Sequence, residues 1–266
     1  MRSGRRAAGV AIGLACAAAT VAGIGASSAV SRLDRQQSSD VPVLVELFTA
    51  EGCSSCPPAD ALLEAMIIKQ PAEGVMIVGL GEHVDYWNGL GWRDRFSSAA
   101  LTARQQVYTR LNKVETYTPQ MVVDGASVFI GSDVGAAKHA IETARAVPHG
   151  ALQIRTEPVS DREIGIAVTA SGLPPLDAGD RAEVVAAVTE DHLRSDVKRG
   201  ENAGKTLTHA AVVRQMVMLG DEPAGQPVRG RLKIDADWDR SQLKIVAFAQ
   251  ARRSRRVLAT AAIRMP

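Results

Sequence analysis

Two cysteines, Cys53 and Cys56, stand in the run Glu-Gly-Cys-Ser-Ser-Cys-Pro-Pro, and they are the side chains best suited to chemistry. Two intervening residues in a turn that enters a helix can bring both sulfurs within bonding distance. Disulfide exchange needs one thiolate that attacks and a second thiol that resolves the mixed disulfide. We therefore predict that Cys53 attacks and is the more exposed, and that Cys56 resolves. A structural zinc site needs about four ligands, and the one other cysteine, Cys16, lies in an apolar N-terminal run.

The cysteine pair stands between a predicted strand and a predicted helix. Residues 43–48 form a nearly continuous apolar run, which is typical of a strand buried on both faces. Residues 59–69 place their apolar side chains on one face of a helix. The two prolines that follow the pair suit a first helical turn, so the helix is expected to start at Cys56 rather than at Cys53. Cys53 then receives less help from the N–H groups at the helix start.

The elements that follow complete a recognisable order. A predicted strand at residues 75–81 is followed by a loop at 82–96 and a helix at 98–111. Two strands at 120–123 and 127–130 and a helix at 133–147 complete the predicted order. The two crossovers imply a parallel core, and an Asp-Gly turn adds an antiparallel edge. This order resembles the thioredoxin fold at the cysteine motif, at Thr118-Pro119 and at the terminal helix. The resemblance implies that Pro119 is cis and that the backbone at Thr118 faces a substrate strand.

Several runs also resemble a family of secreted bacterial proteins known as domain of unknown function 1223. They are residues 46–49, 53–60, 83–87, 90–92, 117–120 and 199–207, followed by His209 and Arg214. The resemblance implies a thioredoxin-like fold and a secreted location, but no reaction. Arg95 stands where the family pattern would have a proline, which alters that loop.

Two further side chains are candidates for proton transfer. Glu46 lies in an apolar strand and resembles the buried acid of thioredoxins; such a carboxyl would have a raised pKa and could shuttle a proton. The alternative is a glutamate that points to solvent at a strand edge. His83 follows a parallel strand, at the sheet edge where active sites gather. It either transfers protons or shapes the substrate site, or it is a structural residue bonded to the backbone. Trp87 and Trp92, in the same loop, are predicted to be structural.

The N-terminal sequence has the pattern of a targeting segment. A basic start precedes an uncharged stretch, residues 7–31, with small residues at 27–29. The stretch is long enough that an uncleaved membrane anchor is an alternative to a cleaved signal. We predict a periplasmic or secreted protein, anchored only if this segment is retained. We predict a signal peptide or anchor at residues 1–29 and a linker at 30–41. A thioredoxin-like domain at 42–148 and a β-rich domain at 149–266 follow.

Charge argues against nucleic acid as a partner. The chain has 31 basic and 29 acidic residues, a net charge of +2. Removal of residues 1–29 takes away three arginines, which leaves 28 basic and 29 acidic residues. Such a chain has no electrostatic reason to bind nucleic acid. The arginine-rich residues 252–256 are predicted to be a solvated hairpin tip.

The sequence pattern of residues 149–266 is typical of a β domain. Six short segments are typical of antiparallel strands, at residues 152–156, 163–169, 182–189, 228–234, 242–250 and 256–263. The predicted class is therefore α/β, with a thioredoxin-like N-terminal domain and a C-terminal antiparallel, sandwich-like β domain. Residues 207–219 could be a strand or a helix. Residues 200–205 form a tight loop without the phosphate-loop pattern, so we predict a packing or interdomain role.

Three functions are compatible with these residues. The first is a thiol–disulfide oxidoreductase, with protein thiols or disulfides as partners and no cofactor. The second is a copper(I)-handling protein that uses Cys53, Cys56 and His83 as ligands, because soft thiolates select copper(I). The third is a non-catalytic binding module in which the disulfide is only structural.

Overall fold

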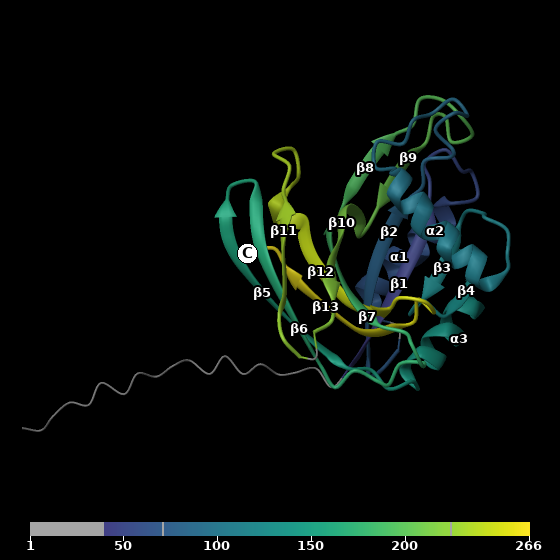
Figure 1. The fold of residues 1–266 in the computed structure, drawn as a ribbon. Helices are drawn as coiled ribbons and strands as arrows, with labels where there is room; N and C mark the ends of the chain where they lie inside the picture. The colour runs from purple at the N-terminus through teal and green to yellow at the C-terminus, as the bar shows by residue number, and fades with distance from the viewer. Residues whose placement is uncertain (1–39, 71, 224) are drawn as a thin grey trace, which may run out of the picture. The chain divides into compact units, whose positions relative to one another are not determined.

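One mixed, eight-stranded sheet dominates the computed structural model, which describes residues 40–70, 72–223 and 225–266 (Figure 1). Its order is β13-β12-β7-β10-β2-β1-β3-β4. The strands are β1 (Val41–Thr49), β2 (Val75–His83), β3 (Gln120–Val123), β4 (Ser127–Ile130), β7 (Ala182–Glu190), β10 (Val212–Asp221), β12 (Leu243–Ala251) and β13 (Val257–Arg264). β1 and β2 are parallel, whereas β3 and β4 add antiparallel strands. The predicted turn between β3 and β4 is confirmed, with positive φ at Asp124 and Gly125.

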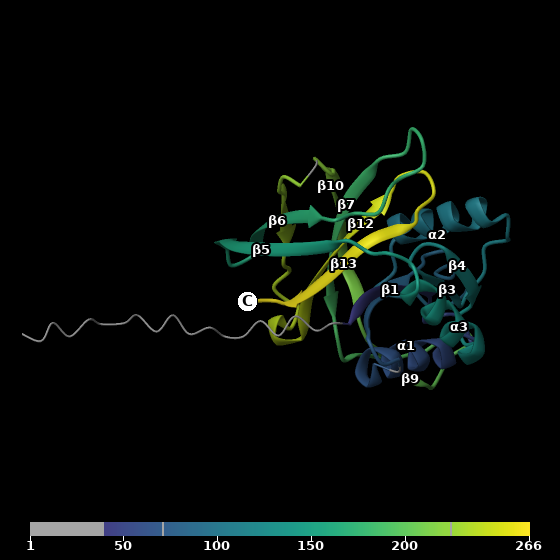
Figure 2. The same cartoon turned by 90° about the horizontal axis from the view of Figure 1, so that it is seen from below.

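Three helices cover the two faces of the β2-β1-β3-β4 part of the sheet. They are α1 (Pro57–Lys69), α2 (Ala99–Asn112) and α3 (Val134–Arg145). Figure 2 shows β1 and β3 between α2 on one side and α1 and α3 on the other. Alternation along β1 explains this: Val43, Val45 and Leu47 pack with α1 and α3, while Leu44 packs on the opposite face with Leu101 of α2.

The start of α1 agrees with the sequence prediction. Cys56 is its N-cap and the two prolines occupy its first turn. Cys53 therefore precedes the helix. The other two helices are capped by side chains, because Ser98 accepts a hydrogen bond from the N–H of Ala100 and Asp133 accepts one from Ala136.

The strands of the second half join the same main sheet through β10, which pairs with β2 at Val212 and Gly81. A small antiparallel sheet faces them, made of β5 (Ala151–Ser160), β6 (Glu163–Ser171) and β11 (Val228–Lys233). Apolar side chains from both sheets form a shared core. All six predicted segments are strands, and the described residues fall in one compact unit. The predicted division at residues 148–149 stays a prediction.

Residues 207–219 are strands, so the helix alternative is wrong. They belong to β9 (Thr206–His209) and β10, separated by Ala211 at φ 51°. β9 pairs only with β8 (Leu193–Asp196), a strand that the sequence did not predict. This two-stranded hairpin carries residues 199–205 at its tip.

The chain is therefore an α/β protein with a mixed main sheet, helices on both faces and a small antiparallel sheet. The order β1-α1-β2-α2-β3-β4-α3, with β1 between β2 and β3, is thioredoxin-like. In the part of the chain that the structure describes, no helix has the length and apolar character to cross a membrane. The predicted signal peptide or anchor, and the linker before residue 40, lie outside the described residues.

Candidate functional site

Cys53 and Cys56 form a disulfide at the start of α1, with their Cα atoms 5.4 Å apart. Both cysteines have no exposed surface, although Ser54 and Ser55 between them are exposed. The predicted greater exposure of Cys53 is therefore wrong for this oxidised pair. The reason is local: the turn places the serines outward and the sulfurs inward, with Cys53 Sγ 3.3 Å from Ser55 Oγ.

The cis-proline loop adjoins the cysteine motif. The Thr118-Pro119 peptide is cis, as the thioredoxin resemblance implied. A Cβ placed on Gly131 would lie 3.1 Å from Pro119 Cβ and 3.2 Å from Ala59 Cβ, so the loop reaches the first turn of α1. Trp87 fixes Thr118, because its indole N–H donates to Thr118 Oγ1 over 2.8 Å.

A loop from the second half of the chain covers the cysteine motif from another direction. We call residues 199–205 the clamp loop. The side-chain amide of Asn202 donates two hydrogen bonds of 2.9 Å, one to the carbonyl of Glu51 and one to the carbonyl of Cys53. The Glu201 carboxylate accepts a hydrogen bond of 3.0 Å from the N–H of Ser54. The predicted packing role of this segment is therefore correct, and its target is the cysteine motif.

Beneath the motif lies a group of ionisable side chains, which we call the histidine cluster: the buried Glu51, His83, Asp94 and His209, and the partly buried Asp60. Asp94 Oδ2 lies 2.6 Å from His83 Nδ1 and also accepts a hydrogen bond from the N–H of Glu51. His209 Nε2 is 3.4 Å from Glu51 Oε1, and the two histidine rings meet edge to face at 4.8 Å. Trp92 donates to the other Glu51 oxygen over 2.6 Å. The predicted structural role of Trp92 is consistent with this contact.

The carboxyls of the histidine cluster differ in their pKa values. Burial raises the pKa of Asp60 to about 7, with His209 and Thr49 acting against the shift and the charges of Asp94 and Glu51 adding to it. Burial also acts on Asp94 and Glu51, but hydrogen bonds outweigh it and hold both pKa values below the ordinary ones. The decisive partners are the charge and hydrogen bond of His83 for Asp94, and His209 for Glu51. Asp60 is thus the carboxyl of this cluster that can exchange a proton near neutral pH.

Glu46 is fully buried, so the solvent-facing alternative is wrong. It lies in what we call the arginine cluster: Glu46, Glu82, Arg104, Tyr108 and Gln250. One Glu46 oxygen is 2.5 Å from Arg104 Nε, and the other accepts a hydrogen bond of 2.6 Å from the Tyr108 hydroxyl. Its hydrogen bonds therefore run to α2 rather than to the cysteines, and its role in proton transfer stays a prediction.

Glu82, the second acid of the arginine cluster, has fewer polar contacts than Glu46. It is fully buried, its oxygens have no hydrogen-bond partner among the described residues, and Arg104 Nε lies 3.6 Å away. Burial and then the charge of Glu46 raise its pKa well above the ordinary value, against the opposing effect of Arg104. Glu82 is therefore the carboxyl of this cluster that burial shifts toward its protonated form.

His83 is also buried, and its partner is Asp94 rather than the backbone. Its ring contacts are Asp94, Phe96 and His209, and no contact of His83 with either cysteine is found among the described residues. Within residues 40–70, 72–223 and 225–266, no three His, Cys, Asp or Glu side chains are arranged to hold a metal ion. The geometry therefore gives the copper(I) alternative no third ligand at His83.

The sequence of this chain matches a protein-family model over residues 44–250, and that family is described as proteins of unknown function, DUF1223. The chain belongs to this family. No curated protein matches it.

Two solved structures share the fold of this DUF1223 member. Protein AGR_C_4864 from Agrobacterium tumefaciens is 28% identical, with a TM-score of 0.63 over 85% of this chain and 96% of that one. HBP35 of Porphyromonas gingivalis is 14% identical, with a TM-score of 0.59 over 85% of this chain and 76% of that one. The second likeness concerns the fold alone.

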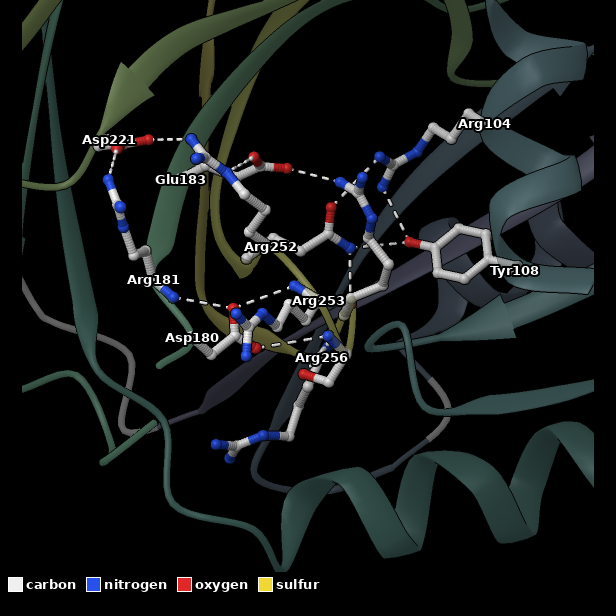
Figure 3. Close-up of polar contacts among 12 residues, drawn as sticks. Arg104, Tyr108, Asp180, Arg181, Glu183, Asp221, Arg252, Arg253 and Arg256 are labelled. Atoms are coloured by element: carbon white, nitrogen blue, oxygen red, sulfur yellow. Dashed lines mark hydrogen bonds and ion pairs between the residues drawn. The ribbon is translucent and has the colours of Figure 1, made fainter. Parts of the chain in front are cut away.

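The arginine-rich hairpin of the DUF1223 chain lies apart from the cysteines. Residues 252–256 do form the turn between β12 and β13, but the tip is not simply solvated (Figure 3). Arg252 lies between Glu183 and Asp221, and Arg255 reaches Glu183 over 2.5 Å. Acidic residues that are distant in sequence thus pair with Arg252 and Arg255, and local sequence carried no information on these contacts.

Sequence reasoning missed most of the polar residues around the cysteine pair. Glu51 and Asp60 flank the motif, so their acidity in an apolar context was an available signal. Asp94 and His209 lie in separate elements and carried no such signal. Asn202 carried a weak signal, because its loop has no predicted role other than packing or interdomain contact.

Proposed function

We propose that this chain is an extracytoplasmic thiol–disulfide oxidoreductase-like protein whose reactive group is the Cys53–Cys56 pair. The observation that carries the proposal is a disulfide-bonded CxxC at the start of α1, on a thioredoxin-like fold, beside the cis Thr118-Pro119 loop. In the exchange, a Cys53 thiolate attacks a substrate disulfide and displaces one substrate thiolate. The Cys56 thiolate then attacks Cys53 Sγ and displaces the second. The pair loses two electrons, the substrate gains them, and the two released thiolates take up protons.

The small loop that the disulfide closes favours a reactive bond over a purely structural one. The two cysteines are separated by three positions. In the chain-entropy model, such a short loop stabilises a fold by only about 2 kcal/mol, against about 3 kcal/mol for a 15-residue loop. A binding module held together by this bond would gain little from it.

The proposed partners are protein thiols or disulfides outside the cytoplasm. The N-terminal pattern supports a periplasmic or secreted location, with membrane attachment only if residues 1–29 are retained. The balanced charge of the remainder gives no reason to include nucleic acid. In this proposal the predicted domains at residues 42–148 and 149–266 work together, since the clamp loop of the second touches the cysteine motif of the first.

A disulfide-exchange assay tests the proposal. The oxidised protein is mixed with a reduced protein that has a cysteine pair, and thiols are followed by alkylation and mass. We expect transfer of the disulfide to the substrate. Cys53→Ser should abolish it. In the reverse direction, Cys56→Ser mixed with the disulfide form of the substrate should accumulate a mixed disulfide, because its Cys53 thiolate displaces one substrate thiolate and no second thiol resolves the bond. Equal exchange by the wild type and by Cys53→Ser would contradict the proposal.

A further inference from the structure

We infer that Asn202 is a positioning residue for the Cys53–Cys56 pair, and that the clamp loop must move aside before a substrate reaches either sulfur. The inference rests on the proposed function, because it concerns access to the same pair. It adds a gate that belongs to the second half of the chain.

Asn202 holds the backbone on both sides of Gly52. Its amide bonds the carbonyls of Glu51 and Cys53, and the side chain has no exposed surface. Lys205 Nζ donates to Asn202 Oδ1 over 2.9 Å, which fixes the orientation of the amide. Without Asn202, two carbonyls at a buried place lose their donor, so the cysteine motif would no longer be held to this loop.

The clamp loop has a defined shape of its own. Gly200 and Gly204 have φ of 76° and 80°, which other residues rarely adopt. Two backbone hydrogen bonds close the loop, from Gly204 N to the Val197 carbonyl and from Val197 N to the Lys205 carbonyl. The loop can therefore swing as a unit rather than unfold.

Access to the sulfurs requires such a movement. An attacking thiolate must reach a sulfur, and both cysteines are fully buried in this arrangement. On one side the pair packs with Trp87 and the apolar group around Phe48, which belong to the core. The clamp loop on the other side is mostly exposed, and it extends from a hairpin of two four-residue strands. The hairpin strands are themselves anchored by buried side chains, among them Leu207 and His209, so the movement is confined to the exposed clamp loop.

Glu201 adds an electrostatic effect to this gate. Its carboxylate takes the Ser54 N–H, and Ser54 in turn holds the pKa of Glu201 below its ordinary value. The N–H is therefore occupied, and a negative charge stands beside the motif. Both effects disfavour an incoming thiolate while the loop is closed.

The test is the rate at which dithiothreitol and an uncharged phosphine reduce the disulfide of the oxidised full-length protein. A dithiothreitol thiolate attacks one sulfur and Cys53–Cys56 breaks; the second thiol then completes a cyclic disulfide. The phosphine is oxidised to its oxide with oxygen from water. Each reductant gives the protein two electrons, and the two cysteines end as thiols. We expect Asn202→Ala to react about tenfold faster with both reductants, because the open loop is more populated.

Matched variants separate the two effects. Glu201→Gln keeps an acceptor for Ser54 and removes the charge, so we expect about twofold to threefold faster reaction with dithiothreitol and no change with the phosphine. Ala203→Ser, at an exposed position of the same loop, leaves the charge unchanged and should match the wild type. Lys205→Met should speed both reactions, but less than Asn202→Ala does. It replaces Asn202→Ala as the test variant if that variant fails to fold. The unfolding free energy of each variant is measured alongside, and a rate that rises by more than global unfolding accounts for reports local opening of the loop.

Unchanged or slower reduction of Asn202→Ala, or of Lys205→Met if the former fails to fold, would overturn the inference. Because these reductants need no protein partner, the gate can be established even if exchange with protein substrates fails. If the protein exchanges disulfides with protein substrates but Asn202→Ala is reduced at the wild-type rate, the proposed function stands and the inference of a gate is wrong.

Discussion

The arginine cluster and the histidine cluster lie on opposite faces of the same two central strands. Glu82 and His83 are consecutive in β2, so their side chains point to opposite faces, one into each cluster. Both clusters are largely buried and both contain more acids than bases. The arginine cluster includes a guanidinium, which keeps its charge at any ordinary pH. The histidine cluster has only imidazoles, whose ordinary pKa lies near neutral.

This difference assigns the two clusters different tasks. The arginine cluster fixes α2 to the sheet through Arg104, whose guanidinium keeps its charge at any ordinary pH. The histidine cluster contains Asp60, whose pKa is raised by burial to about 7. It also contains Glu51, which stands two residues before Cys53. The cysteine pair thus adjoins both clusters: Glu51 of the histidine cluster precedes it in sequence, and Tyr108 of the arginine cluster packs in the same apolar group.

The largest expected effect comes from the arginine cluster. Arg104→Met leaves the Glu46 carboxylate buried without its cation, so we expect a loss of about 3–5 kcal/mol of unfolding free energy. Denaturant unfolding of the oxidised protein measures it. Arg181→Met removes an exposed ion pair to Asp221 and should cost less than about 1 kcal/mol. A similar small loss for both variants would mean that Arg104 does not hold the arginine cluster together.

A smaller, pH-dependent effect is expected at Asp60. Because its folded pKa is raised above the unfolded value, the unfolded chain loses the proton first as pH rises from about 4 to 7. Stability from this group therefore falls across that window. Asp60→Asn removes the cost. The full shift corresponds to about 4 kcal/mol, and because Asp60 is only partly buried we expect a gain relative to wild type on the order of 2 kcal/mol between pH 4 and pH 8. The measurement is denaturant unfolding of both proteins at the two pH values, and an equal difference at both would rule out the raised pKa.

The fold was largely predictable, whereas the surroundings of the cysteines were not. The CxxC, the Thr118-Pro119 step and the order of elements follow from local patterns of apolar residues, prolines and glycines. The contact of Asn202 with Cys53 joins residues 149 positions apart, and it depends on the path of the β8–β9 hairpin. Local periodicity carries no information on such a contact.

Glu46 illustrates the same limit. Its place in an apolar run left both burial and a solvent-facing position open, and it carried no information on the partner that meets it in the core. Arg104 comes from α2, 58 positions along the chain, and takes one of the two carboxylate oxygens. An acid that was expected to serve the cysteines proved to have its hydrogen bonds in the arginine cluster.

The smallest expected effect concerns Glu51. Its pKa is lowered because hydrogen bonds outweigh burial, so its stabilising contribution is present above about pH 4.5 and is lost as pH falls through the folded pKa. Glu51→Gln keeps the shape and the acceptor for Trp92 but removes the charge that faces His209. We expect a loss of about 1 kcal/mol at pH 7 and a smaller loss at pH 4, measured by thermal or denaturant unfolding. An equal loss at both pH values would place no charge on Glu51 in the folded protein.

The reduction potential of the Cys53–Cys56 pair tests the central claim most directly. The protein is equilibrated in dithiol–disulfide buffers of known potential, and its free thiols are counted by alkylation and mass. The account predicts a potential above about −300 mV, within the range of exchanging pairs, with Cys53 alkylated before Cys56 in the reduced protein. A potential below about −300 mV would identify a structural disulfide and contradict the account.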